Sequence, residues 1–94
     1  MSDLKTVRVE IFGHVQGVWF RGWTMKEATA FGLDGWVRNR ADGHVEAVFH
    51  GPAATVDAML AACRHGPPAA RVTDVAIESW HELPAPGFHQ RPSY

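Results

Sequence analysis

The stretch Gly13-His14-Val15-Gln16-Gly17-Val18-Trp19-Phe20-Arg21 separates two segments of different periodicity. Before it, the residues from Val7 to Phe12 alternate between apolar and polar, which is typical of a strand with one buried face. After it, the segment from Phe20 to Phe31 has apolar residues at helical spacing. Gly13 and Gly17 allow the backbone to turn so that successive N–H groups point into one concavity. The stretch therefore predicts a strand, an anion-binding loop and a helix, in that order.

Arg21 stands where this helix is expected to begin. A helix N-terminus offers unpaired N–H groups and a partial positive charge, and a guanidinium group can bind two phosphate oxygens at once. The glycine spacing matches neither the dinucleotide-binding pattern nor the P-loop pattern. Taken alone, the loop is explained as well by a hairpin-like turn with a solvated arginine as by an anion site.

The rest of the chain predicts three more main strands, a second helix and a short edge strand. The strands are expected at residues 33–39, 44–49 and 72–80, the helix from Pro52 to its stop at Gly66-Pro67-Pro68, and the edge strand at 88–91. An irregularity is expected between Val72 and Val75, where the alternation slips. The order β-α-β-β-α-β with a tail suits an α+β domain of the split β-α-β type. In that layout both helices lie on one face of an antiparallel sheet.

This layout brings two distant parts of the sequence together. The first and second strands run parallel with the third strand between them, so their ends lie two strand spacings apart, roughly 9–10 Å. The loop after the first strand then meets Asn39, which ends the second strand just before the predicted turn at Asp42-Gly43. A phosphoryl group held by the loop would lie within reach of the Asn39 side chain.

The chain resembles the acylphosphatase family at these positions and at others. The matching residues are the loop from Gly13 to Arg21, Ala28, Gly32-Leu33, Gly35-Trp36-Val37, Asn39, Asp42-Gly43, Val45-Glu46, Gly51, Gly66-Pro67, Ala70, Val72 and the segment from Phe88 to Pro92. The resemblance covers roughly residues 5 to 92, with boundaries uncertain by about 2–4 residues. It implies a ferredoxin-like α/β sandwich and hydrolysis of acyl phosphates, the mixed anhydrides of carboxylic and phosphoric acids.

The resemblance also assigns roles to the residues of the site. The backbone N–H groups of the loop and the Arg21 guanidinium would bind the phosphoryl group, and Asn39 would orient the attacking water. The loop residues concerned are Val15, Gln16, Gly17, Val18, Trp19 and Phe20. A carboxylate leaves readily, so no general acid is required. The loop lacks a P-loop lysine and no cluster of aspartates accompanies it, so we expect no metal ion and no other cofactor.

Composition limits the class of protein and its partners. With 94 residues we expect one domain, residues 1–94, and the formal net charge of −1 argues against nucleic acid or an anionic membrane as partner. Cys63 is the single cysteine, no apolar run is long enough for a membrane span, and the first residues lack a secretion signal. We therefore expect a cytoplasmic monomer that acts on a small acyl phosphate, with inorganic phosphate as product and competitor.

Two other functions fit the same fold. One is a phosphate-binding or regulatory module without turnover, which the presence of both Arg21 and Asn39 disfavours. The other is a small nucleic-acid-binding domain, which would need a basic surface with aromatic residues on the open sheet face.

Several single residues also have two interpretations. His14 is expected to face solvent rather than act as a base, Cys63 to lie in the core rather than act as a nucleophile, and the pair His44 and His50 not to bind a metal. Trp19 and Trp23 either border the acyl pocket or pack in the core. Arg38 and Arg40 are expected to be surface charges that attract anionic substrate.

Overall fold

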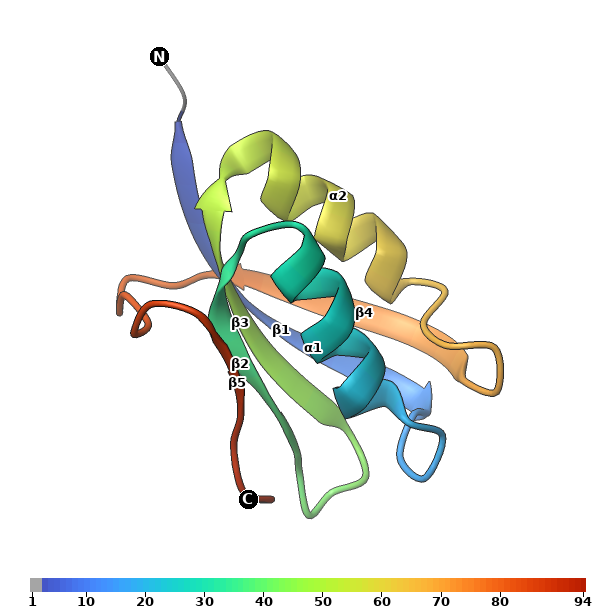
Figure 1. Cartoon of the computed structure of the whole chain (residues 1–94). Coiled ribbons are helices and arrows are strands. Elements are labelled where there is room, and N and C mark those ends of the chain that lie inside the picture. Colours follow the sequence, from blue (N-terminus) through green and yellow to red (C-terminus); the bar gives the residue numbers. More distant parts are fainter. Residues whose placement is uncertain (1–2) are drawn as a thin grey trace.

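The computed structural model describes residues 3–94, and it contains two helices and a five-stranded sheet (Figure 1). The elements are, in chain order, β1 (Leu4–His14), α1 (Phe20–Ala30), β2 (Asp34–Asn39), β3 (Val45–Pro52), α2 (Ala53–Cys63), β4 (Arg71–Ser79) and β5 (Phe88–Gln90). Figure 1 shows both helices on the same face of the sheet, as the α+β ferredoxin-like prediction requires. Of the helices within residues 3–94, neither has the length and apolar character that a membrane crossing demands.

The strands lie in the order β4-β1-β3-β2-β5, so β3 separates β1 from β2 as predicted. The pairs β1–β3, β1–β4 and β2–β3 are antiparallel, but β5 runs parallel to β2. The sheet is therefore mixed. Its four main strands pair antiparallel, as predicted, and β5, whose direction the sequence does not predict, adds one parallel pair. The physical reason is the route of the chain. Residues 80–87 carry it from the end of β4 to the opposite edge, so β5 must return in the direction opposite to β4, which is the direction of β2.

The core forms between the helices and one face of the sheet. Val7, Val9 and Ile11 of β1 are buried, as the alternation predicts. The helices contribute Phe20, Thr24 and Ala28 from α1 and Val56, Met59, Leu60 and Cys63 from α2.

Two predicted details at the helix ends are wrong. Phe31 follows α1 as its C-terminal cap and is 40% exposed, because the helix ends one residue before it. Pro52 ends β3 and caps α2 with an extended ψ of 137°, so the helix begins at Ala53 rather than at Pro52.

A change of register between β1 and β4 sets where β1 gives way to the loop. Phe12 pairs with Asp74, but the next residue, Gly13, pairs with Val72, so one residue of β4 is left over. The irregularity falls between Val72 and Val75, as predicted. Gly13 has a φ of 122°, and a Cβ there would lie 2.1 Å from the Arg71 carbonyl oxygen. Only glycine fits this close approach of two backbones, so Gly13 fixes the direction in which the chain enters the loop.

Candidate active site

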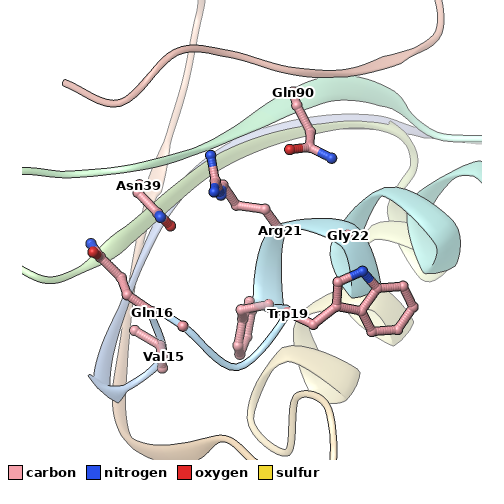
Figure 2. Close-up of a pocket in the computed structure, with 9 residues that line it drawn as sticks. Val15, Gln16, Trp19, Arg21, Gly22, Asn39 and Gln90 are labelled. Carbon is pink, nitrogen blue, oxygen red and sulfur yellow. The ribbon is translucent and has the colours of Figure 1, made fainter.

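One pocket contains most of the residues that the sequence predicts for the site (Figure 2). It has a volume of about 190 Å³ and is lined by Val15, Gln16, Gly17, Trp19, Phe20, Arg21, Gly22, Asn39 and Gln90. The loop after β1 and the end of β2 therefore meet at the same edge of the sheet. Val18 is the predicted loop residue that does not line the pocket, because its side chain packs partly buried against the core.

The loop presents its backbone N–H groups without internal partners. Within residues 3–94, the N–H groups of residues 16–19 donate no hydrogen bond to a backbone carbonyl. Gly17 and Trp19 both have positive φ angles, of 75° and 68°, and such alternation turns successive N–H groups toward one side. Trp19 is also the N-terminal cap of α1. The first N–H groups of a helix have no hydrogen-bond acceptor within the helix. This backbone is suited to hold an anion.

The side chains of Arg21 and Asn39 are both free to meet a ligand. Among the described residues, no carboxylate forms an ion pair with Arg21. The Asn39 amide likewise makes no side-chain hydrogen bond in residues 3–94. In Figure 2 the Arg21 side chain extends from α1 into the space between Asn39 and Gln90. A cation and an amide that pair with no other side chain of residues 3–94 thus line the same small pocket.

Gln16 has a role that the sequence does not reveal. Its side-chain Nε2 donates hydrogen bonds to the Arg40 carbonyl oxygen at 2.8 Å and to the His44 carbonyl oxygen at 2.9 Å. Both carbonyls belong to the turn between β2 and β3, which directly follows Asn39. The amide of Gln16 therefore ties the loop to the turn that carries Asn39.

The segment after β5 also contacts this edge of β2. The Arg91 N–H donates to the Val37 carbonyl oxygen, and the Tyr94 N–H donates to the Asn39 carbonyl oxygen, both at 2.9 Å. The Ala41 N–H in turn donates to the Tyr94 carbonyl oxygen at 2.5 Å. The backbone of Asn39 is therefore held by β3 on one side and by this segment on the other.

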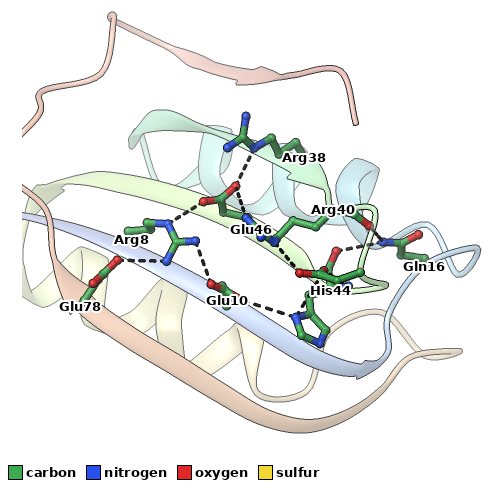
Figure 3. A network of polar contacts seen from close by, with 9 residues as sticks. Arg8, Glu10, Gln16, Arg38, Arg40, His44, Glu46 and Glu78 are labelled. Atoms are coloured by element: carbon green, nitrogen blue, oxygen red, sulfur yellow. Dashed lines mark hydrogen bonds and ion pairs between the residues drawn. The ribbon is translucent and has the colours of Figure 1, made fainter. Parts of the chain in front are cut away.

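Arg38 and Arg40 belong to an ion-pair network and are not the free surface charges that the sequence predicts (Figure 3). Glu46, which is 3% exposed, accepts hydrogen bonds of 2.6 Å from Arg8 Nε and from Arg38 Nε. Arg40 Nε donates to Asp42 at 2.9 Å. The Arg38 guanidinium also lies 4.3 Å from the Tyr94 ring centre and 4.9 Å from that of Trp36. These positive charges are matched by carboxylates and aromatic faces, so they do not form a field that steers an anionic substrate.

The network shifts the pKa of its central carboxylate. Burial by itself would raise the pKa of Glu46, but the hydrogen bonds and charges of Arg38 and Arg8 outweigh burial and hold it below its ordinary value. A lowered folded-state pKa contributes stability above the ordinary glutamate pKa of about 4.3, and that contribution is lost as the pH falls through the folded-state value.

Replacing Glu46 by glutamine should therefore destabilise the fold in a pH-dependent way. Glu46→Gln leaves two partly buried arginines without their charged acceptor, and we expect the free energy of unfolding to fall by roughly 1.5–3 kcal/mol at pH 7. The difference from the wild type should shrink as the pH falls below the ordinary glutamate pKa of about 4.3 and on through the lower folded-state value, because Glu46 then takes up a proton. Urea unfolding at both pH values measures it. Glu78, which also pairs with Arg8 but whose side chain is 56% exposed, provides the control, and Glu78→Gln should cost roughly 0–1 kcal/mol. Equal losses for the two variants would contradict this account.

The structure brings together three potential metal ligands that the sequence does not predict. Glu10, Asp42 and His44 each offer one ligand atom, and these atoms lie within 4.8 Å of one another. His44 Nδ1 lies 3.4 Å from a carboxylate oxygen of Glu10 and from one of Asp42, and it makes no hydrogen bond with the residues that the structure describes. These residues come from β1 and from the turn before β3, which sequence spacing cannot relate. His50, the other member of the predicted histidine pair, instead contacts Thr6 at 2.6 Å. None of these side chains lines the pocket around Arg21.

Other sequence interpretations are resolved by burial. Cys63 is fully buried, and burial raises the pKa of its thiol to about 12, so it is a core residue and not a nucleophile. His14 is exposed and does not line the pocket. Trp19 lines the pocket and is 62% exposed, whereas Trp23 packs against the core with its ring 5.3 Å from that of Phe20.

Gly22, which directly follows Arg21, and Gln90 are the two pocket residues that the sequence analysis did not predict. Phe88 anchors β5 in the core, and Gln90, two residues later, points to the same face of the sheet as Phe88. Because side chains alternate between the two faces of a strand, the buried Phe88 was the signal in the sequence that could have placed Gln90 on this face.

Comparison with known proteins identifies the family. The family model for acylphosphatase matches residues 7–90. An acylphosphatase from Rhodospirillum rubrum is 60% identical over 90 residues, which cover 96% of this chain and 99% of that protein. The solved structure of an acylphosphatase from Coxiella burnetii has a TM-score of 0.90 at 32% identity and covers 95% of this chain and 94% of its own. That of an acylphosphatase from Bacillus subtilis has a TM-score of 0.87 at 34% identity and covers 95% of this chain and 99% of its own. With the loop, Arg21 and Asn39 meeting in one pocket of this fold, the chain belongs to the acylphosphatase family.

Proposed function

We propose that this chain hydrolyses the carboxyl–phosphate bond of acyl phosphates without a metal ion, and that the pocket around Arg21 and Asn39 carries out the reaction. The products are a carboxylate and inorganic phosphate. The observation that supports this assignment is the meeting in one pocket of three groups that have no partner in the described part of the chain: the loop N–H groups, the Arg21 guanidinium and the Asn39 amide.

The loop and Arg21 would bind the phosphoryl group. In phosphoryl transfer, negative charge is spread over the oxygens of the transferring group, and catalysis depends on positioning and on charge stabilisation. The N–H groups from Val15 to Phe20 and the guanidinium supply fixed donors for those oxygens. No carboxylate competes for Arg21 among the described residues, so its charge is available to the substrate.

Asn39 would orient the attacking water. Its side-chain oxygen accepts a hydrogen bond and its NH₂ group donates one, so one amide can fix a water molecule in a defined direction. The water oxygen bonds to phosphorus as the bond from phosphorus to the acyl oxygen breaks, and the carboxylate leaves with that electron pair. An amide is not a base, so the proton of the water passes to the phosphate or to solvent.

The pocket, as residues 3–94 form it, has no side chain that could act as a general acid toward the leaving group. Among the lining residues there is no aspartate, glutamate, histidine, lysine or cysteine. An alkoxide leaving group needs a proton from a general acid, whereas a carboxylate does not. The pocket therefore suits acyl phosphates and disfavours phosphate monoesters.

We further propose that the partners are small molecules and that the protein works as a cytoplasmic monomer. Inorganic phosphate would occupy the same loop as product and compete with substrate. The formal net charge of −1, together with the pairing of Arg8, Arg38 and Arg40 with carboxylates, disfavours nucleic acid as a partner.

The experiment that tests this function compares two substrates with and without a chelator. We expect kcat/KM for benzoyl phosphate to exceed that for phenyl phosphate by at least 10²–10⁴-fold, about the contribution that a general acid makes where one is present. Hydrolysis of benzoyl phosphate should persist after exhaustive EDTA treatment and dialysis, because the Glu10, Asp42 and His44 cluster lies outside the pocket.

Three results would contradict the proposal. Comparable rates for the two substrates would remove the specificity argument, and a loss of activity that Mg²⁺ or Zn²⁺ restores would overturn the metal-free mechanism. Phosphate binding without any turnover of benzoyl phosphate would favour the binding-module alternative. Arg21→Gln, purified in parallel, controls for a contaminating phosphatase.

A further inference from the structure

We propose that the acyl group of the substrate lies in a groove between α1 and β5, and that the chain prefers acyl phosphates with an apolar acyl group of several carbons or an aromatic ring. This inference rests on the proposed function, because it extends the pocket that binds the phosphoryl group. The groove is lined by Gly22, Met25, Lys26, Thr29, Ala30 and Gln90, and it has a volume of about 520 Å³.

The groove runs along one side of α1. Its five helical residues follow the spacing i, i+3, i+4, i+7 and i+8 from Gly22, so they share one face of the helix. This face differs from the one formed by Phe20, Thr24 and Ala28, which packs into the core. Lys26 is the one charged side chain among the lining residues, and Met25 packs against the core and forms an apolar floor. The surface is therefore suited to a hydrocarbon group.

The groove is continuous with the phosphoryl pocket. Gly22 and Gln90 line both of them, so the two spaces meet at these residues. A Cβ on Gly22 would lie 2.0 Å from Nε1 of the Trp19 indole, so the glycine leaves room for Trp19 at this junction. The exposed Trp19 indole forms a further wall of the pocket.

The stereochemistry of the reaction points the leaving group toward this junction. In phosphoryl transfer the attacking and leaving oxygens lie roughly in line through phosphorus. With the water at Asn39, the acyl oxygen must emerge on the side of the phosphorus remote from Asn39. Figure 2 shows Arg21 between Asn39 and Gln90, so the remote side is that of Gln90 and Gly22. The Gln90 amide can donate a hydrogen bond to the departing carboxylate there.

The length of the acyl group should therefore affect the rate. Each methylene transferred from water to an apolar surface favours binding by up to about fourfold, and a half-open groove realises part of that, so we expect a rise of about two- to fourfold per methylene. The acyl group is chemically unchanged and leaves as its carboxylate. Acetyl phosphate, whose acyl group ends at a single methyl carbon, serves as the internal reference because it has the least hydrocarbon to place in the groove.

The test measures kcat/KM for acetyl, butyryl, hexanoyl and benzoyl phosphate on the wild type and on Thr29→Glu. Thr29 is exposed, so the variant should fold, and its carboxylate would add a negative charge to the lining of the groove. We expect the hexanoyl-to-acetyl and benzoyl-to-acetyl ratios to fall at least fivefold, with the inhibition constant of inorganic phosphate little changed. Ala58→Glu, an exposed position on α2 outside the groove, is the matched control and should keep the wild-type ratios.

The outcomes separate this inference from the proposed function. If the wild type hydrolyses all four substrates but the ratios are the same in Thr29→Glu and Ala58→Glu, the acyl group does not use the groove, and the proposed function stands. If the wild type hydrolyses none of them, the proposed function fails and the groove assignment fails with it. A general effect of the added negative charge would lower all four rates alike and leave the ratios unchanged, which also counts against the groove.

Discussion

Arg21→Gln is expected to lower kcat/KM for an acyl phosphate by on the order of 10³-fold or more, the scale known for arginines that stabilise phosphoryl transfer. The guanidinium is the cation that lines the pocket, and none of the described carboxylates pairs with it. Its removal takes away substrate binding and charge neutralisation together. Steady-state kinetics and the inhibition constant of inorganic phosphate measure the two effects.

Arg21→Lys separates charge from geometry. An ammonium group keeps the charge but cannot make the two-pronged contact with phosphate oxygens, so this variant should also be severely impaired. Near-normal activity of the lysine variant would show that charge alone suffices. Arg64→Gln, at the C-terminal cap of α2 and outside the pocket, is the matched control for loss of one arginine.

Asn39→Ala should lower kcat by about 10²–10³-fold, the usual cost of one positioned dipole at a transition state, while inhibition by phosphate remains nearly intact. The variant should keep the backbone of the site. The Asn39 carbonyl oxygen still accepts from the Tyr94 N–H, and the strand pairing with Val45 does not involve the side chain. The change in stability should stay within about 1 kcal/mol, and circular dichroism can confirm the fold.

Two results would contradict the proposed role of Asn39 in orienting the water molecule. A loss of phosphate affinity in parallel with kcat would make it a phosphate ligand or a support of the loop. An unchanged kcat would leave it as a turn residue, and the mechanism would lack its group for orienting water.

The helices and main strands could be predicted from the sequence, because burial of one face produces alternation in a strand and a spacing of three or four residues in a helix. Alternation placed Val7, Val9 and Ile11 on the buried face of β1, and helical spacing identified the buried faces of both helices. The direction of β5 did not follow, because three residues carry no directional signal and the route of residues 80–87 decides it. The start of α2 was displaced because Pro52 is compatible with both a strand end and a helix start.

The candidate site was predictable where function depends on residues of one contiguous motif. The loop and Arg21 are adjacent in sequence, and Asn39 ends a strand whose place in the sheet follows from the topology. The side-chain bonds of Gln16 were not predictable, because its partners lie 24 or more residues away in the chain. The place of Gln90 in the pocket could be inferred only from the alternation that begins at buried Phe88. The ion pair between Arg38 and Glu46 was not predicted for a related reason. The number of charged residues in a sequence does not show which of them meet across neighbouring strands.

The amide of Gln16 also limits how the turn between β2 and β3 can vary. Surface turns usually accept insertions, because few contacts depend on their length. Here the Arg40 and His44 carbonyls must both stay within reach of one side chain. A residue added between positions 40 and 44 would separate those two acceptors and release the loop from the segment that holds Asn39. The length of this turn is therefore constrained by the geometry of the proposed site, although the exposed residues within it, Ala41, Asp42 and Gly43, touch no substrate in the proposed mechanism.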